Sequence, residues 1–386
     1  MQTLKIGDLE PRIPVIQGGM GVAVSLSGLA SAVANEGGIG IISSAVIGML
    51  LPGFSKDLQR ANVIALRREI RKTRRMTSGI IGVNIMMALT DYEEHMVVAV
   101  EEGVDLIISG AGLPLKVPQV LLDDKAGANR TKFLPIVSSA KAASLIFRYW
   151  SSHYGVIPDG VVVEGPAAGG HLGFKKDELE EPRHSLGKVV PEVVEVMRTY
   201  GEQYGRDLPV IAAGGIYTGE DMYRIMEKGA AGVQIATRLV PTHECDASQA
   251  FKEAYVESRE EDLMIIESPV GLPGRAIRNR FLEEVEGGKR HPVNCPWKCL
   301  RTCDYQTAPY CIALALVNAA KGNLKNGFVF AGSSAYRTEK ISSVQEVLQE
   351  MLEEYRVAEA VRKTLKGDRK TLRNMPLRKE DIQKAV

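Results

Sequence analysis

Short apolar runs alternate with amphipathic stretches along most of this chain. Eight runs of four to eight residues have the character of buried strands and lie at 14–17, 39–44, 79–86, 105–109, 133–137, 160–164, 209–213 and 232–235. Each is followed by a stretch in which apolar residues recur at helical spacing. A continuous apolar run bounded by Gly or Pro is typical of a parallel strand covered on both faces. The pattern therefore predicts eight successive βα units.

Eight βα units in series predict an α/β protein with a (β/α)8 barrel, the TIM-barrel fold. An open doubly wound sheet is the alternative, but no G-x-G-x-x-G turn follows the first strand. After residue 260 the pattern changes. We expect residues 1–260 to form the barrel, 261–345 to form a cysteine-containing loop and helical extension packed on it, and 346–386 to form a charged helical tail.

Composition and charge narrow the class of protein. The 386 residues are 45% hydrophobic and 25% charged, and the formal net charge is +1. With this balance no global field argues for nucleic acid or an anionic membrane as a partner, and the partner that we expect is a small-molecule substrate. No apolar run reaches the length of a membrane span, and the N-terminus lacks the form of a signal peptide. We therefore expect a cytoplasmic protein, and a homodimer is the assembly that we consider.

One histidine stands where barrels bind their ligands. The segment Val161–Gly173 is a buried strand that runs into a glycine-rich turn, and His171 lies in that turn. Ligands bind at the carboxyl ends of the strands in α/β folds. A histidine there suits general-base catalysis near neutral pH, since its ordinary pKa is about 6.5. The alternative is a loop histidine without a special role.

Two further turns favour a phosphate site. Gly214-Gly215 follows the seventh strand and Ala236-Thr237 the eighth, and barrels often bind phosphate between these two loops. A phosphate there suits flavin mononucleotide (FMN), with the flavin ring over Gly18-Gly19-Met20 and Asn84. Each feature also has a simpler explanation, as a tight turn or as a buried polar group.

Together these segments resemble the nitronate monooxygenase family and the related flavin-dependent enoyl-acyl-carrier-protein reductases. The matching motifs are 14–20, 82–84, 109–112, 164–173, 212–216 and 233–238, in the order of the family. Ala236 departs slightly, because the family often has Gly there. The resemblance implies an FMN-bearing barrel with His171 as the base. It also implies a cofactor-binding set of Gln17, Gly18, Gly19, Met20, Asn84, Glu164, Gly170, Ala213, Gly214, Gly215, Gln234, Ile235, Ala236 and Thr237.

Three functions remain open. The first is an FMN-dependent oxidoreductase that oxidises nitronates or nitroalkanes with oxygen. The second is an NAD(P)H-dependent enoyl-acyl-carrier-protein reductase, for which the basic stretch from Arg67 to Arg75 would meet an acidic carrier protein. That stretch is otherwise a solvated helix face. The third is a flavin and iron–sulfur electron-relay protein without a small substrate.

The cysteines are unevenly distributed. Four of the five lie within 17 residues, as Cys295, Cys299, Cys303 and Cys311. On a helix, cysteines four residues apart would share one face and could converge on a metal. An iron–sulfur cluster, a zinc ion and plain packing are the three interpretations, because the spacing matches no ferredoxin or zinc-ribbon pattern.

Overall fold

The computed structural model describes residues 3–122, 131–291 and 294–365. Eight parallel strands form one sheet in the order β1-β9-β8-β6-β5-β4-β3-β2, and a parallel bridge between Ile16 and Ile39 joins its two edge strands. The (β/α)8 barrel is therefore confirmed. Its strands are β1 (Val15–Gln17), β2 (Gly40–Ser43), β3 (Ile81–Met86), β4 (Leu106–Gly110), β5 (Lys132–Val137), β6 (Val161–Glu164), β8 (Val210–Ala213) and β9 (Gly232–Ile235).

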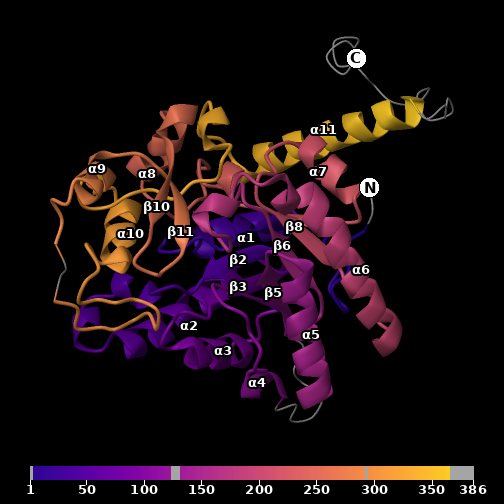
Figure 1. Ribbon diagram of the computed structural model, residues 1–386, viewed down its shortest axis with the longest axis horizontal. Helices are drawn as coiled ribbons and strands as arrows, with labels where there is room; N and C mark the ends of the chain where they lie inside the picture. The colour runs from indigo at the N-terminus through magenta and orange to yellow at the C-terminus, as the bar shows by residue number, and fades with distance from the viewer. Residues whose placement is uncertain (1–2, 123–130, 292–293, 366–386) are drawn as a thin grey trace.

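Helices surround the strands (Figure 1). They are α1 (Ser27–Asn35), α2 (Leu58–Met76), α3 (Tyr92–Glu101), α4 (Gln119–Leu122), α5 (Ala140–Tyr154), α6 (Leu186–Tyr204), α7 (Gly219–Met226) and α8 (Gln249–Val256). Alternate residues of a strand face the barrel interior and the surrounding helices, so the hydrophobic core has two parts. In β6, Val162 belongs to the cluster inside the barrel, whereas Val161 and Val163 face the helices. Both faces of the sheet are covered, so the strands consist of continuous apolar runs.

A long-range contact holds the first helix. The Asp246 carboxylate accepts hydrogen bonds from the backbone N–H groups of Leu26, Gly28 and Leu29, at 2.8, 2.9 and 3.1 Å. These are donors that the first turn of a helix leaves without partners. A negative charge is also favourable at this end of the helix dipole. One side chain beyond β9 thus fixes the helix that follows β1.

The chain after α8 builds a second, smaller sheet beside the barrel. Strands β10 (Leu263–Glu267) and β11 (Pro273–Ile277) form an antiparallel hairpin, and β11 also pairs with β7 (Gly170–His171). The glycine-rich turn predicted around His171 is therefore partly a strand. Helices α9 (Arg280–Glu286), α10 (Ile312–Ala320) and α11 (Val344–Leu365) follow, and α11 packs along α7 (Figure 1). The part of the predicted tail from residue 366 onward lies outside the described residues.

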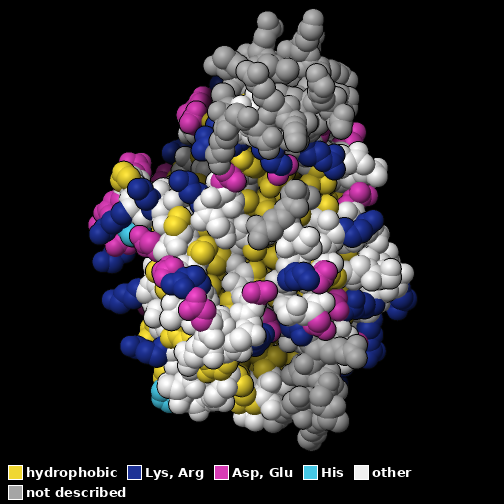
Figure 2. All heavy atoms as spheres, turned by 90° about the vertical axis from the view of Figure 1, so that its right-hand side faces the viewer, with side chains coloured by type: hydrophobic (Ala, Val, Ile, Leu, Met, Phe, Trp, Pro, Cys, Tyr) yellow, Lys and Arg dark blue, Asp and Glu magenta, His cyan; other side chains and the backbone are white. Residues whose placement is uncertain are grey.

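The surface carries charges of both signs. Figure 2 shows Lys and Arg side chains interspersed with Asp and Glu on the face that it presents. The basic helix α2 is partly neutralised by its neighbours: Arg67 and Arg71 bind Glu102, and Arg74 binds Asp105. These ion pairs reduce the positive charge that α2 could offer to an acidic partner. Among the described helices, none combines the length and apolar character of a membrane span.

Candidate active site

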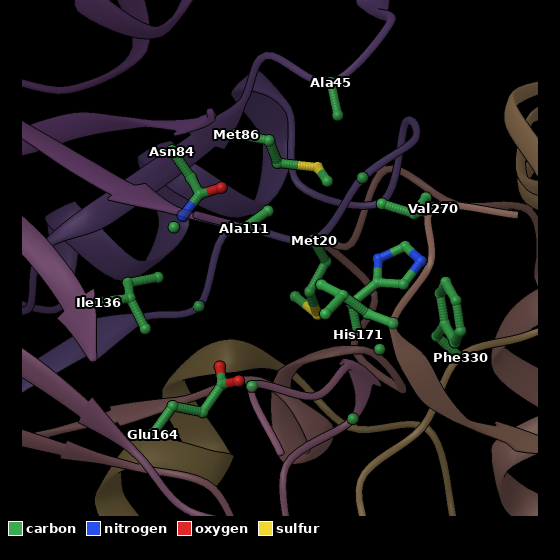
Figure 3. A pocket seen from close by; sticks show the side chains of 18 of the residues that line it. Met20, Ala45, Asn84, Met86, Ala111, Ile136, Glu164, His171, Val270 and Phe330 are labelled. Carbon is green, nitrogen blue, oxygen red and sulfur yellow. The ribbon is translucent and has the colours of Figure 1, made fainter. Parts of the chain in front are cut away.

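A cavity of about 800 Å³ opens at the carboxyl ends of the barrel strands. Its size suits a cofactor or drug-sized ligand. Figure 3 shows Met20, Asn84, Glu164 and His171 directed into it from different parts of the chain. One wall comes from the barrel, and the other from the hairpin β10–β11 and the segment around Phe330. The small second sheet therefore completes the site.

His171 is fixed by neighbours from distant parts of the sequence. Its strand β7 pairs with Gly274 of β11, its Nε2 lies 2.7 Å from the Ser268 hydroxyl, and its ring meets Phe330 edge-on at 5.0 Å between centroids. Burial lowers the pKa of His171 to about 4. The imidazole is therefore neutral at pH 7, which is the state that a general base requires.

The partner of Nε2 bears on which nitrogen can accept a proton. The Ser268 hydroxyl oxygen already accepts the backbone N–H of Val270 at 3.3 Å. A hydroxyl oxygen has a second lone pair, so it can also accept from Nε2–H. In that tautomer Nδ1 carries the free lone pair, and within the described part of the chain Nδ1 has no hydrogen-bond partner. Figure 3 shows the two ring nitrogens on opposite edges of the imidazole.

Glu164, the last residue of β6, is another titratable group in the cavity wall. Burial raises its pKa to about 7. A carboxyl group with this pKa is protonated in a large fraction of molecules at neutral pH. It can then donate a hydrogen bond to a ligand as well as accept one.

The ends of β1, β3 and β9 approach closely at the base of the cavity. A Cβ on Gly19 would lie 2.2 Å from Asn84 Cβ, and one on Gly18 would lie 3.0 Å from Ala236 Cβ. Glycine is therefore needed at 19 to leave room for the Asn84 amide. Gln234 contributes a buried side-chain oxygen with no hydrogen-bond partner among the described residues. A buried acceptor without a protein partner usually accepts a hydrogen bond from a ligand or from water.

Three unpaired backbone donors lie in the cavity wall. The N–H groups of Ala236, Thr237 and Gly332 have no acceptor within the described residues. Thr237 and Gly332 are adjacent, since a Cβ on Gly332 would lie 2.5 Å from the Thr237 hydroxyl. A group of free N–H donors with a hydroxyl is a typical environment for a phosphate.

Most of the predicted site residues line this one cavity, namely Gly18, Gly19, Met20, Asn84, Glu164, Gly170, His171, Gln234, Ala236 and Thr237. Four others, Ala213, Gly214, Gly215 and Ile235, do not line it, and Gly214 and Gly215 lie against Ala168 and Ala167 respectively. Gln17 has a different role. Its fully buried amide bonds both backbone groups of Ile41, at 2.7 and 3.2 Å, and so ties β1 to β2.

Some residues of the site have no clear signal in the sequence. Ser268, Phe330 and Gly332 lie 97 or more residues beyond His171 in the chain. Arg275 is another, because its guanidinium donates to the carbonyls of Pro166 and Ala168 at 2.7 and 2.6 Å and holds the loop before His171.

The four clustered cysteines lie outside the flavin-sized cavity but next to it. The chain over 294–311 contains no helix, so the predicted shared helix face is wrong. All four nevertheless line one small second cavity. In the described ranges, no three or more His, Cys, Asp or Glu side chains form a group that could hold a metal ion.

Comparison with known proteins supplies the family. The family model described as nitronate monooxygenase matches residues 3–102 and 87–354. The chain belongs to the nitronate monooxygenase family. Flavin dependence is a feature of that family, and members of it are oxidoreductases.

Curated and solved relatives agree with this assignment. A probable nitronate monooxygenase of Staphylococcus aureus is 28% identical over 300 residues, which is 70% of this chain and 77% of the relative. A "(3aS,4S,5R,7aS)-5-hydroxy-7a-methyl-1-oxo-octahydro-1H-indene-4-carboxyl-CoA dehydrogenase" of Mycobacterium tuberculosis is also 28% identical, over 72% of this chain, but the match spans only 66% of that protein.

Among solved structures, FabK from Thermotoga maritima superposes with a TM-score of 0.69 at 27% identity, covering 92% of this chain and 96% of FabK. A nitroalkane oxidase from Streptomyces ansochromogenes has a TM-score of 0.68 at 19% identity, covering 91% and 98%. The second likeness concerns the fold alone.

Proposed function

We propose that this protein is an FMN-dependent oxidoreductase that oxidises nitronates or nitroalkanes with oxygen, and that His171 is its general base. Membership of the nitronate monooxygenase family supports the reaction class. The observation that carries the proposal is a buried, neutral histidine in the wall of a cofactor-sized cavity.

The residues present fit FMN. The free N–H groups at Ala236, Thr237 and Gly332 would hold its phosphate. The Asn84 amide and the unpartnered Gln234 oxygen would bond polar atoms of the flavin ring, and Gly18 and Gly19 would let the ring approach the strand ends. When bound, the flavin would accept electrons from the substrate and pass them to oxygen.

The chain itself would supply the proton transfer. With Nε2–H donated to Ser268, Nδ1 of His171 would take the proton from the carbon that bears the nitro group, leaving the nitronate anion. The resulting imidazolium would be stabilised by that anion. Apolar side chains around it, among them Phe330 and Val270, would keep water from the reacting carbon.

The test is to assay His171→Ala with two forms of one substrate. A neutral nitroalkane must lose a proton before oxidation, whereas its preformed nitronate has already lost it. We expect the variant to lose about 10²- to 10⁴-fold in turnover of the nitroalkane, while turnover of the nitronate changes far less. His153→Ala is the matched control, because His153 is an exposed residue stacked on Tyr149 outside the cavity. Equal losses on both substrates, or none, would remove His171 from the proton-transfer step.

The second candidate is an NAD(P)H-dependent FMN enoyl-acyl-carrier-protein reductase. The observation in its favour is the apolar outer wall of the cavity, where Met86, Val270, Leu272 and Leu300 could contact an acyl chain. Rapid anaerobic bleaching of the flavin by NADH would favour this candidate over the first.

A further inference from the structure

The four clustered cysteines meet although no regular element holds them. Cys295, Cys299, Cys303 and Cys311 all line the second cavity, between the irregular segment 294–311 and the start of α10. The segment is anchored to the loop after β3: Leu300 bridges Leu89, and Arg301 N–H donates to the Ala88 carbonyl. The convergence is therefore part of the fold and does not depend on a shared helix face.

The thiols are close enough to influence one another. Cys311, Cys295 and Cys303 each act electrostatically on the Cys299 thiol. The four side chains are therefore neighbours in the folded chain, as the cavity that they share also shows. Four cysteine sulfurs are the usual ligand set of an iron–sulfur cluster.

The cysteines are not arranged around one ion. Among the described residues, no group of three or more His, Cys, Asp or Glu side chains is placed to hold a metal ion, and one zinc ion would need its four sulfurs about 2.3 Å from a common point. In an iron–sulfur cluster the thiolates bind different iron atoms, so the four sulfurs surround a larger body. No carboxylate or histidine is among the residues that line this cavity, and its charged side chain is Lys298. A cation there suits a cluster that carries net negative charge.

We propose that Cys295, Cys299, Cys303 and Cys311 bind an iron–sulfur cluster beside the cofactor cavity. Leu300, Ile312 and Ala313 line both cavities, so a single layer of side chains separates the two sites. The cluster site does not depend on the function proposed above, since its ligands lie outside the residues assigned to FMN and to proton transfer.

The experiment measures iron and acid-labile sulfide per chain in the full-length protein, purified without oxygen and reconstituted with ferrous iron and sulfide. We expect iron and sulfide in equal amounts in the unmodified protein. Cys299→Ser and Cys303→Ser should lose most of both. The control is Cys245→Ser, because Cys245 is buried apart from the cluster and should not affect the metal content.

A cysteine variant could lose iron because it misfolds and not because a ligand is missing. A measurement on the unmodified protein distinguishes the two causes. Alkylation of the native protein should spare the four cysteines, and removal of iron by a chelator under reducing conditions should make all four reactive. The proposal is overturned by absence of iron after reconstitution, by zinc bound without sulfide, by disulfides among the four, or by metal content that Cys299→Ser leaves unchanged.

Discussion

Replacement of His171 by Gln should make the protein more resistant to acid. Gln is neutral at all pH values and can still hydrogen-bond the Ser268 hydroxyl, so the substitution removes the titration and keeps the polar contact. Burial lowers the pKa of His171 to about 4, from an ordinary value of 6.5. The unfolded chain therefore binds a proton at this residue at higher pH than the folded protein does.

The sign and size of the effect follow from proton linkage. Above about pH 6.5 neither state is protonated at His171, and the residue has no pH-dependent effect on stability. As pH falls from about 6.5 to about 4, the unfolded state gains the proton first, and the free energy of unfolding decreases. The full loss below about pH 4 is about 3 kcal/mol, at ~1.4 kcal/mol per pH unit. At about pH 5 the loss is about 2 kcal/mol.

The assay is denaturant unfolding of the wild type and His171→Gln at about pH 7.5 and about pH 5. The wild type should lose about 2 kcal/mol more than the variant between these two conditions. His153→Gln serves as the control, because an exposed histidine should give no such difference. If the wild type and His171→Gln lose equal stability, His171 is not held neutral by burial, and its assignment as a base that is ready at neutral pH is refuted.

Three other predictions concern residues around the site and the barrel. Ser268→Ala should lower kcat on nitroalkane by about 10-fold with little change in KM, and Ser268→Thr should restore kcat. An unchanged kcat in Ser268→Ala would show that Ser268 does not orient the imidazole. Gly19→Ala should weaken FMN binding, measured by fluorescence titration, because the added Cβ would lie 2.2 Å from Asn84 Cβ. Gly187→Ala is the control, because a Cβ there would meet nothing within 4 Å and should leave FMN binding unchanged. Asn62→Ala should lower the free energy of unfolding by about 3 kcal/mol, since Asn62 donates at 2.7 Å to the buried Asp91 carboxylate beside His95; a loss under about 1 kcal/mol would contradict this.

The barrel could be predicted because its strands are buried on both faces. Runs such as Val161–Glu164 and Val210–Ala213 contain little but apolar residues, and their helices carry a clear period. The hairpin β10–β11 had a weaker signal, because only its first strand, Leu263–Glu267, is an apolar run. Its second strand contains Pro273 and Gly274, which suggest a loop, and it is stabilised by pairing with β7, a strand of two residues.

The candidate site divides in the same way. Asn84, Glu164 and His171 each end or follow a predictable strand, so their meeting at one rim follows from the barrel. Ser268 and Phe330 reach the site through tertiary packing that no local pattern encodes. Gln17 also stands at a strand end, but its amide is used to join β1 to β2, and its position alone could not reveal this.

The measurement that tests the central claim most directly is the visible spectrum of the FMN-reconstituted protein without oxygen, before and after addition of a nitronate and, separately, of NADH. The account predicts bound-flavin absorbance that the nitronate changes at once and NADH alone leaves unchanged. Bleaching by NADH with no response to nitronate would contradict the proposed substrate. Absence of flavin absorbance after reconstitution would contradict the assignment of the cavity to FMN.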